Sequence, residues 1–293
     1  MLKLKSSLLE KDTLTHLADK QAVINALAVS LRVARAQTLW DSKSSAARGK
    51  IAFDRIKQTL IKLCVSIELC NYCEHNEATD IEHIYPKSFF PERTFLWSNY
   101  LLACKTCNTH YKLDQFAVFI PAQSATASML QRKQIPASND AAFIDPRIED
   151  PMHYLFLDIT GKSFYFTPHP SLTDPRDIAK ADRTLAVLQI GQRAGLARAR
   201  KDAFEFYQSK LERYRDVQSV TTWEELEHLV QDPHLVDRVN NFESEKQLML
   251  AGLKRSILEH LHPTVWYEMQ RQHQLLNKTK RLFEDVPDAL TWK

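Results

Sequence analysis

The chain has 293 residues, of which 44% are hydrophobic and 26% are charged, the composition of an ordinary globular protein. This length allows a sizeable core and one or two domains. No run of 18 apolar residues is present, so the sequence predicts no membrane span. The N-terminus lacks the apolar segment of a secretory signal, and we expect a cytoplasmic protein.

The formal net charge is only +3, but basic residues are concentrated before residue 63 and again between residues 193 and 215. Such clusters are typical of proteins that bind a polyanion. Solvated helix faces have the same composition, so charge alone leaves both interpretations open.

Apolar residues at three- and four-residue steps predict helices over about 13–37 and 44–67. A polar, Ala/Ser-rich connector follows at 121–142. Aromatic and β-branched runs around Thr160 and Gly161 then predict a β-hairpin over about 153–166.

The remaining chain has helical patterns. Asp174 and Pro175 predict the start of a helix that Gly191 can end, and Thr222 with Glu225 has the spacing of a capping box. A last long helix is expected to begin near residue 236.

The predicted fold class is α+β, mostly helical, with a small β-containing module inserted between helical regions. The boundaries of this module divide the chain into three parts. These are a helical N-terminal region (1–66), the module itself (67–121) and a mostly helical C-terminal region that contains the predicted hairpin (122–293).

Four of the five cysteines form two Cys-x-x-Cys pairs, Cys70 with Cys73 and Cys104 with Cys107, separated by 30 residues. Two such pairs predict a closed tetrahedral zinc site that is structural, because no coordination position is left for chemistry. The fifth, Cys64, lies beside the apolar stripe of the second helix and is interpreted as a core residue.

Between the two pairs, Glu82 and His83 place a carboxylate beside an imidazole, and Asn108 follows Cys107 directly. Closing the zinc site brings Asn108 into the same small unit as Glu82 and His83. A divalent cation on the two oxygen donors, with His83 as base, is the minimal set for phosphodiester hydrolysis.

These residues resemble the HNH nuclease family, whose fold is the ββα-metal, treble-clef-like module. The resemblance covers about 43 residues, namely Cys70/Cys73, Glu82-His83 before Pro86, Asn99 in "WSNYLLAC", and "CKTCNTHYK". It implies that His83 is the general base and that Glu82 and Asn108 hold Mg²⁺ or Mn²⁺. Asn99 is implied to orient His83 through the loop.

Lys112 is implied to approach a phosphate or stabilise the product. The family more often has Asp or His in place of Glu82, so Asp80 is kept as an alternative metal ligand, and His110 as an alternative to Asn108. Lys87 and Arg93 are expected, with Lys112, to contact the nucleic-acid backbone.

A looser resemblance, carried by "DIEHIYPKS", "FLWSNYLLAC" and "DPRIEDP", links the chain to HNH subunits of Septu-type and retron-linked anti-phage systems. It implies an ATPase partner and an antiviral defence role. The expected function is DNA hydrolysis, with double-stranded DNA as the expected substrate. Two alternatives stay open: a non-catalytic zinc module for nucleic-acid binding or protein docking, and an RNA-cleaving effector with the same site.

Overall fold

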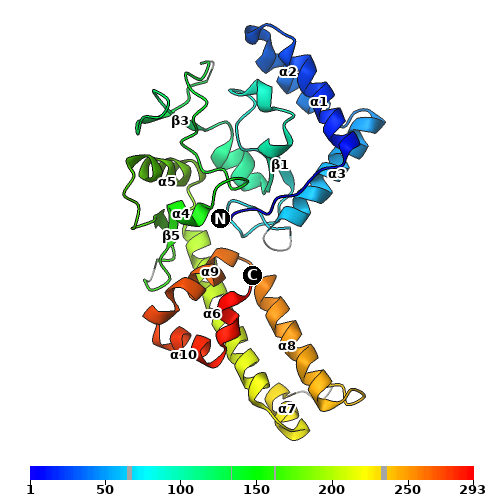
Figure 1. Ribbon diagram of the computed structural model, residues 1–293, viewed down its shortest axis with the longest axis vertical. Helices are drawn as coiled ribbons and strands as arrows, with labels where there is room; N and C mark the ends of the chain where they lie inside the picture. Colours follow the sequence, from blue (N-terminus) through cyan, green and yellow to red (C-terminus); the bar gives the residue numbers. More distant parts are fainter. Residues whose placement is uncertain (65–67, 133, 162, 232–235) are drawn as a thin grey trace. The chain divides into compact units, whose positions relative to one another are not determined.

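The computed structural model describes residues 1–64, 68–132, 134–161, 163–231 and 236–293 (Figure 1). The fold is mostly helical with small antiparallel sheets, in agreement with the predicted α+β class. It divides into two compact units, which comprise Met1–Phe156 with Tyr165–Arg193, and Leu157–Phe164 with Ala194–Lys293. None of the helices in these described ranges is long and apolar enough to cross a membrane.

The first unit opens with three helices: α1 (Lys11–Asn25), α2 (Val29–Asp41) and α3 (Ala47–Leu63). The single helix predicted over 13–37 is therefore wrong, because the chain turns between α1 and α2. Arg32 of α2 donates to the carbonyl oxygens of Leu27 and Asn25, both at 2.9 Å. The last carbonyl groups of a helix have no hydrogen-bond donor within the helix. Here the Arg32 guanidinium is the donor for the carbonyl groups at and just after the end of α1. The end of the helix predicted over 44–67 falls on 65–67, which lie outside the described residues.

A short hairpin follows, formed by β1 (Asp80–His83) and β2 (Tyr100–Ala103). The strands are antiparallel, with Asp80 opposite Ala103 and His83 opposite Tyr100. After β2 the chain enters a π-helix, η3 (Thr106–Lys112). This order of two strands and a helical turn is the one that the resemblance implies for the residues between 67 and 121.

Helices α1 to α3 pack against this hairpin through one shared apolar core. Its buried members include Leu17, Ile24, Leu39, Phe53, Ile56, Leu60, Tyr100 and Leu102. Cys64 packs at the edge of the same core, as predicted. The hairpin is thus held by the helices that precede it, and the predicted boundaries at 66–67 and 121–122 fall inside the first unit.

The rest of the first unit contains β3 (Ala117–Phe119), β4 (Ala127–Met129), α4 (Pro151–Tyr154), all but the last residue of β5 (Leu155–Leu157), β6 (Phe166–Pro168) and α5 (Pro175–Leu188). Strands β3 and β4 form one antiparallel pair, and β5 and β6 form a second two-stranded sheet. The hairpin predicted over 153–166 is therefore present with shifted ends, since residues 153–154 belong to α4.

The predicted start of α5 is confirmed, because the Asp174 carboxylate accepts a hydrogen bond from the Arg176 N–H at 2.8 Å. The predicted stop is displaced. Gln189, with φ of 51°, takes the left-handed position that ends the helix. Gly191 is required for another reason: a Cβ there would lie 2.5 Å from the carbonyl oxygen of Phe166.

The second unit is built from helices: α6 (Ala194–Ser219), α7 (Trp223–Val230), α8 (Phe242–Leu258), α9 (Pro263–Gln272) and α10 (Asn277–Asp285). The capping box of Thr222 and Glu225 is confirmed at the start of α7. The last long helix begins at Phe242, later than predicted, where Asn241 caps it by accepting from the Ser244 N–H.

Candidate metal centre and catalytic cleft

The four predicted cysteine ligands come together in the first unit. Cys70, Cys73, Cys104 and Cys107 are buried, and their sulfur atoms all lie within 4.8 Å of one another. The sulfur atoms of Cys73 and Cys104 are 3.9 Å apart. Tetrahedral zinc with bonds of about 2.3 Å needs sulfur atoms about 3.8 Å apart, so this arrangement fits a closed structural zinc site.

N–H donors surround the sulfur cluster. Asn76 Nδ2 lies 3.6 Å from Cys104 Sγ, and Arg193 donates to Cys107 Sγ at 3.4 Å. The Arg193 guanidinium also lies over the ring of Tyr111, 4.3 Å from its centroid. Four thiolates around a zinc ion carry net negative charge, which such donors stabilise. The sequence places Arg193 only in a basic cluster and gives no sign of this contact.

His83 ends β1 with a fixed ring orientation. Its Nε2 lies 2.9 Å from the carbonyl oxygen of Thr94, which also accepts a hydrogen bond from the Tyr100 hydroxyl at 2.7 Å. A carbonyl only accepts, so Nε2 carries the hydrogen and Nδ1 keeps its lone pair. Burial lowers the pKa of His83 to about 3, with Lys87 adding to the effect. The ring is therefore neutral at neutral pH.

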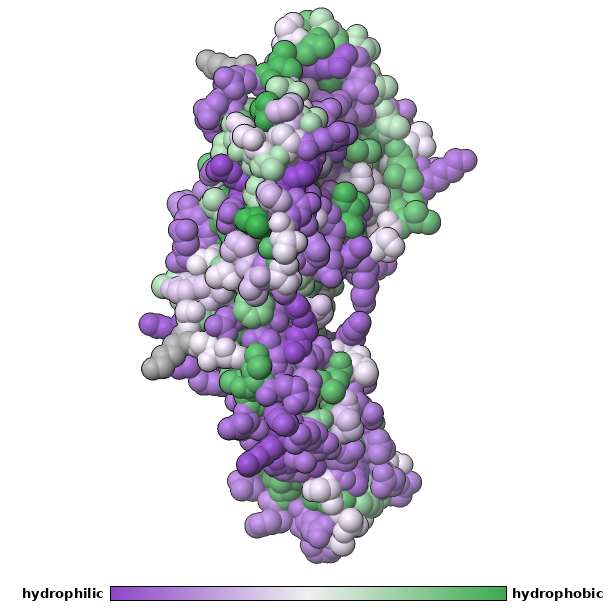
Figure 2. All heavy atoms as spheres, turned by 60° about the vertical axis from the view of Figure 1, so that its left-hand side comes forward, coloured by the Kyte–Doolittle hydropathy of each residue, from purple (hydrophilic) through white to green (hydrophobic). Residues whose placement is uncertain are grey.

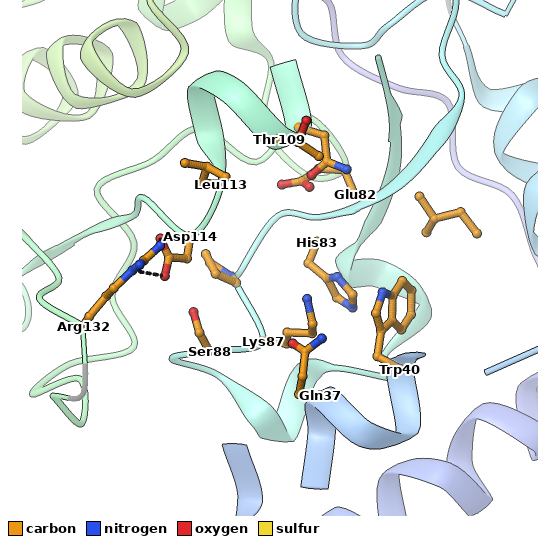
Figure 3. Close-up of a pocket in the computed structure, with 13 residues that line it drawn as sticks. Gln37, Trp40, Glu82, His83, Lys87, Ser88, Thr109, Leu113, Asp114 and Arg132 are labelled. Atoms are coloured by element: carbon orange, nitrogen blue, oxygen red, sulfur yellow. Dashed lines mark hydrogen bonds and ion pairs between the residues drawn. The ribbon is translucent and has the colours of Figure 1, made fainter. Parts of the chain in front are cut away.

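Trp40 packs against the same ring. The Trp40 and His83 ring centroids are 4.2 Å apart at an interplanar angle of 64°. Figure 3 shows the two rings beside each other, with Lys87 also close to the imidazole and Glu82 on the side of Thr109. Trp40 lies on α2, 43 positions before His83, and no local pattern in the sequence connects them.

Glu82 and Lys112 form a buried ion pair. Lys112 Nζ lies 2.5 Å from Glu82 Oε1 and donates to the carbonyl oxygen of His83 at 2.7 Å. The Lys112 side chain is 0% exposed and that of Glu82 is 4% exposed. Burial raises the pKa of Glu82, while the Lys112 charge opposes this rise. The predicted contact of Lys112 with a phosphate is incompatible with this arrangement, because its ammonium is enclosed and already bonded.

Asn108 lines the cleft that also contains Glu82 and His83, a cavity of about 360 Å³. Its Nδ2 donates to Asp80 Oδ2 at 3.0 Å, which leaves its Oδ1 as an oxygen donor. Asp80, the alternative metal ligand, does not line the cleft, and it contacts the cleft residue Asn108 through this hydrogen bond. His110, the alternative to Asn108, is exposed and stacks edge-on against Tyr111.

The donor set suits a hard divalent cation, since carboxylate and amide oxygens are the ligands that Mg²⁺ and Mn²⁺ prefer. Glu82 and Asn108 would hold such an ion. Glu82 has to be shared between the ion and Lys112, because one of its oxygens already contacts the ammonium.

Asn99 holds the loop between the two strands. Its Nδ2 donates to the carbonyl oxygens of Tyr85 and Arg93, both at 3.0 Å, and its Oδ1 accepts from the Tyr85 N–H at 2.8 Å. Arg93 immediately precedes Thr94, whose carbonyl contacts His83. Asn99 therefore acts on His83 through the loop and not by direct contact.

The two other predicted nucleic-acid contacts differ. Lys87 lines the cleft, and burial lowers its pKa, which Glu82 opposes. The Arg93 guanidinium instead lies over the ring of Tyr85, 3.9 Å from the centroid, and Arg93 is not among the residues that line the cleft. Lys87 is therefore the better placed of the two for a phosphate in the cleft.

No protein-family model, curated protein or solved structure matches this chain, so the interpretation of the site depends on its residues and their geometry.

Proposed function

We propose that the protein is a metal-dependent endonuclease of the HNH type that hydrolyses phosphodiester bonds of DNA. The observation that carries this proposal is the contact of His83 Nε2 with the carbonyl oxygen of Thr94, in a cleft that Glu82 and Asn108 also line. Because the carbonyl accepts the Nε2 hydrogen bond, Nδ1 is assigned as the base. A structural zinc role for the cysteines supports it, because that cluster frames the hairpin and η3 on which these residues lie.

In the proposed reaction, His83 Nδ1 removes a proton from a water molecule whose oxygen attacks phosphorus. The bond to the 3′ oxygen breaks, and this oxygen takes up a proton from solvent, giving a 5′-phosphate and a 3′-hydroxyl. Lys112 donates a hydrogen bond to the His83 carbonyl oxygen, and the Thr94 carbonyl accepts one from the imidazole ring. These two contacts fix the orientation in which His83 Nδ1 faces the attacking water. Mg²⁺ or Mn²⁺ on Glu82 and Asn108 would stabilise negative charge on the phosphate.

Nothing in this mechanism contacts the sugar, so RNA is a second substrate to be tested with the same site. The defence role and the ATPase partner depend on the looser sequence resemblance alone.

The test is a cleavage assay on plasmid DNA and on RNA in Mg²⁺ or Mn²⁺. His83→Ala should keep its zinc content and fold but lose cleavage. His153→Ala serves as the control, because this exposed histidine lies on α4, does not line the cleft and is predicted to leave the rate unchanged. Equal cleavage by His83→Ala and wild type would refute the proposal.

A further inference from the structure

A second and larger cavity adjoins the catalytic cleft within the first unit. Its volume is about 790 Å³, and it shares Ser88, Asp114 and Arg132 with the cleft. Cavities of about 300–1,000 Å³ are typical of ligand sites. We call this second cavity the groove. Figure 3 shows the Arg132–Asp114 pair at the edge of the cleft away from Trp40.

One face of α2 forms a wall of both cavities. Val29, Val33, Gln37 and Trp40 follow at steps of four, four and three, which places them on one side of a helix. Val29 and Val33 line the groove, whereas Gln37 and Trp40 line the cleft. At 1.5 Å per residue this wall is about 16 Å long, and at 3.4 Å per stacked nucleotide it matches about five nucleotide steps.

The chemistry changes along this wall. The cleft end carries the acid, base and amide groups of the catalytic proposal. The groove end combines apolar side chains with polar and charged ones. The apolar members are Val29, Val33, Phe89, Pro91, Ile135 and Pro136, and the polar and charged members are Ser30, Arg32, Ser88, Glu92, Asp114, Arg132, Gln134 and Asn139. Val29 and Val33 are 54% and 42% exposed, so the apolar wall is open to an occupant. Figure 2 shows that hydrophobic side chains gather in small patches on a largely hydrophilic surface.

We propose that the groove receives the unpaired bases of a single nucleic-acid strand whose scissile phosphate lies in the catalytic cleft. This inference rests on the proposed endonuclease function. A duplex presents its phosphates and keeps its bases stacked inside, so an apolar wall has little to contact. A single strand exposes base faces, which apolar and aromatic side chains bind without regard to sequence. The proposal replaces double-stranded DNA, the substrate expected from the sequence.

Arg132 is placed to bind the backbone between the two cavities. It forms an ion pair with Asp114 through two hydrogen bonds, at 2.9 and 3.2 Å, and its side chain is 75% exposed. Exposed ion pairs contribute little stability, so a phosphate can draw the guanidinium from Asp114 at small cost. The strand would then run from the cleft past Arg132 into the groove.

The experiment measures binding and cleavage of a fluorescent 12-nucleotide single strand and its duplex. Val33→Glu is compared with Val23→Glu, because Val23 is also 42% exposed but lies on α1 and lines neither cavity. Binding is measured in the His83→Ala background so that the strand stays intact, and cleavage in the wild-type background. Val33→Glu should weaken single-strand binding about tenfold, because it removes apolar contact area and puts a negative charge beside the strand, and Val23→Glu should weaken it less than about twofold.

Melting temperature and zinc content establish that both variants are folded. If Val33→Glu binds the single strand as well as Val23→Glu does, the groove has another occupant, such as a protein, and the inference is wrong. Tighter binding of the duplex than of the single strand also overturns it. In either case, cleavage by the wild-type protein still supports the proposed endonuclease function. If the wild type cleaves no nucleic acid at all, both the endonuclease function and the single-strand groove are wrong.

Discussion

The ammonium of Lys112 lies 2.5 Å from the carboxylate of Glu82, and both side chains are buried. This pair joins the last turn of η3 to the last residues of β1, because Lys112 also bonds the His83 carbonyl at 2.7 Å. The helix that carries Cys107 and Asn108 is thereby tied to the strand that carries the proposed base. One lysine thus connects the zinc centre with the cleft.

Replacing Lys112 by Met should strongly destabilise the protein, because it leaves the Glu82 carboxylate buried without a counter-charge. Removal of one member of a buried ion pair costs about 3–5 kcal/mol of unfolding free energy. Urea denaturation measures this loss, with Lys57→Met, an exposed position on α3, as the control. Adding Glu82→Gln to Lys112→Met should restore part of the stability. A loss no greater than that of Lys57→Met would mean that the pair is not formed.

Replacing Asn99 by Ala should loosen the loop between β1 and β2. The change removes three hydrogen bonds and leaves the Tyr85 N–H and two carbonyls without their partner. We expect a loss of about 2–4 kcal/mol, since each buried polar group without a partner costs about 1–3 kcal/mol.

Hydrogen exchange gives the sharper readout for Asn99→Ala. The Tyr85 amide is protected by the Asn99 side chain and should exchange faster in the variant, while the strand amide of Leu101 should change much less. Ser98→Ala, at the neighbouring exposed position, is the control and should leave the Tyr85 amide protected. Unchanged exchange in Asn99→Ala would contradict the assigned hydrogen bonds.

Arg193 should slow the loss of zinc. Its guanidinium donates to Cys107 Sγ at 3.4 Å and is held in place over the Tyr111 ring. Outer-shell groups of this kind change metal affinity by about 10–100-fold. Zinc transfer to a colorimetric chelator should therefore be faster for Arg193→Gln than for wild type, with Arg198→Gln, an exposed arginine, as the control. Identical transfer rates in the two variants would show that the contact does not act on the metal.

The sequence allowed the local parts of the site to be predicted because they depend on short spacings. The two Cys-x-x-Cys pairs predict a sulfur cluster, and the cluster is formed. The alternation of Asp80, Ile81, Glu82 and His83 places them on an extended strand, and β1 has these bounds. Capping at Asp174 and at Thr222 was predictable for the same reason: the hydrogen bonds join residues two or three positions apart.

The rest depended on contacts between distant parts of the chain. Trp40 on helix α2 contacts His83 on strand β1, and Arg193 contacts Cys107 across 86 positions. For Lys112 the sequence gives the charge but not its surroundings, and a lysine is usually solvated. Its burial follows from the packing of η3 against β1, which only the folded chain defines. The groove along α2 could not be predicted either, because residues from segments 88–92 and 134–139 complete it.

Asp145 should make the stability of the protein depend on pH. Burial raises its pKa from 3.8 to about 6, even though the Arg147 N–H donates to Oδ1 at 2.9 Å. The folded state therefore holds the proton more tightly than the unfolded state. The stabilising contribution is fully present below pH 3.8 and is lost as pH rises through about 6. At 1.36 kcal/mol per pKa unit, the loss amounts to roughly 3 kcal/mol.

Asp145→Asn should remove this dependence, because the amide keeps an oxygen for the Arg147 N–H but carries no charge. Urea denaturation at several values between about pH 4.5 and 7 should show the variant gaining stability relative to wild type as pH rises, with the gain levelling off above about 6. Asp54→Asn, at an exposed position on α3, should follow the wild-type curve. Because zinc loss at low pH affects all three proteins alike, the difference between their curves isolates the carboxyl group. Parallel curves for Asp145→Asn and wild type would show that Asp145 titrates as it does in the unfolded chain.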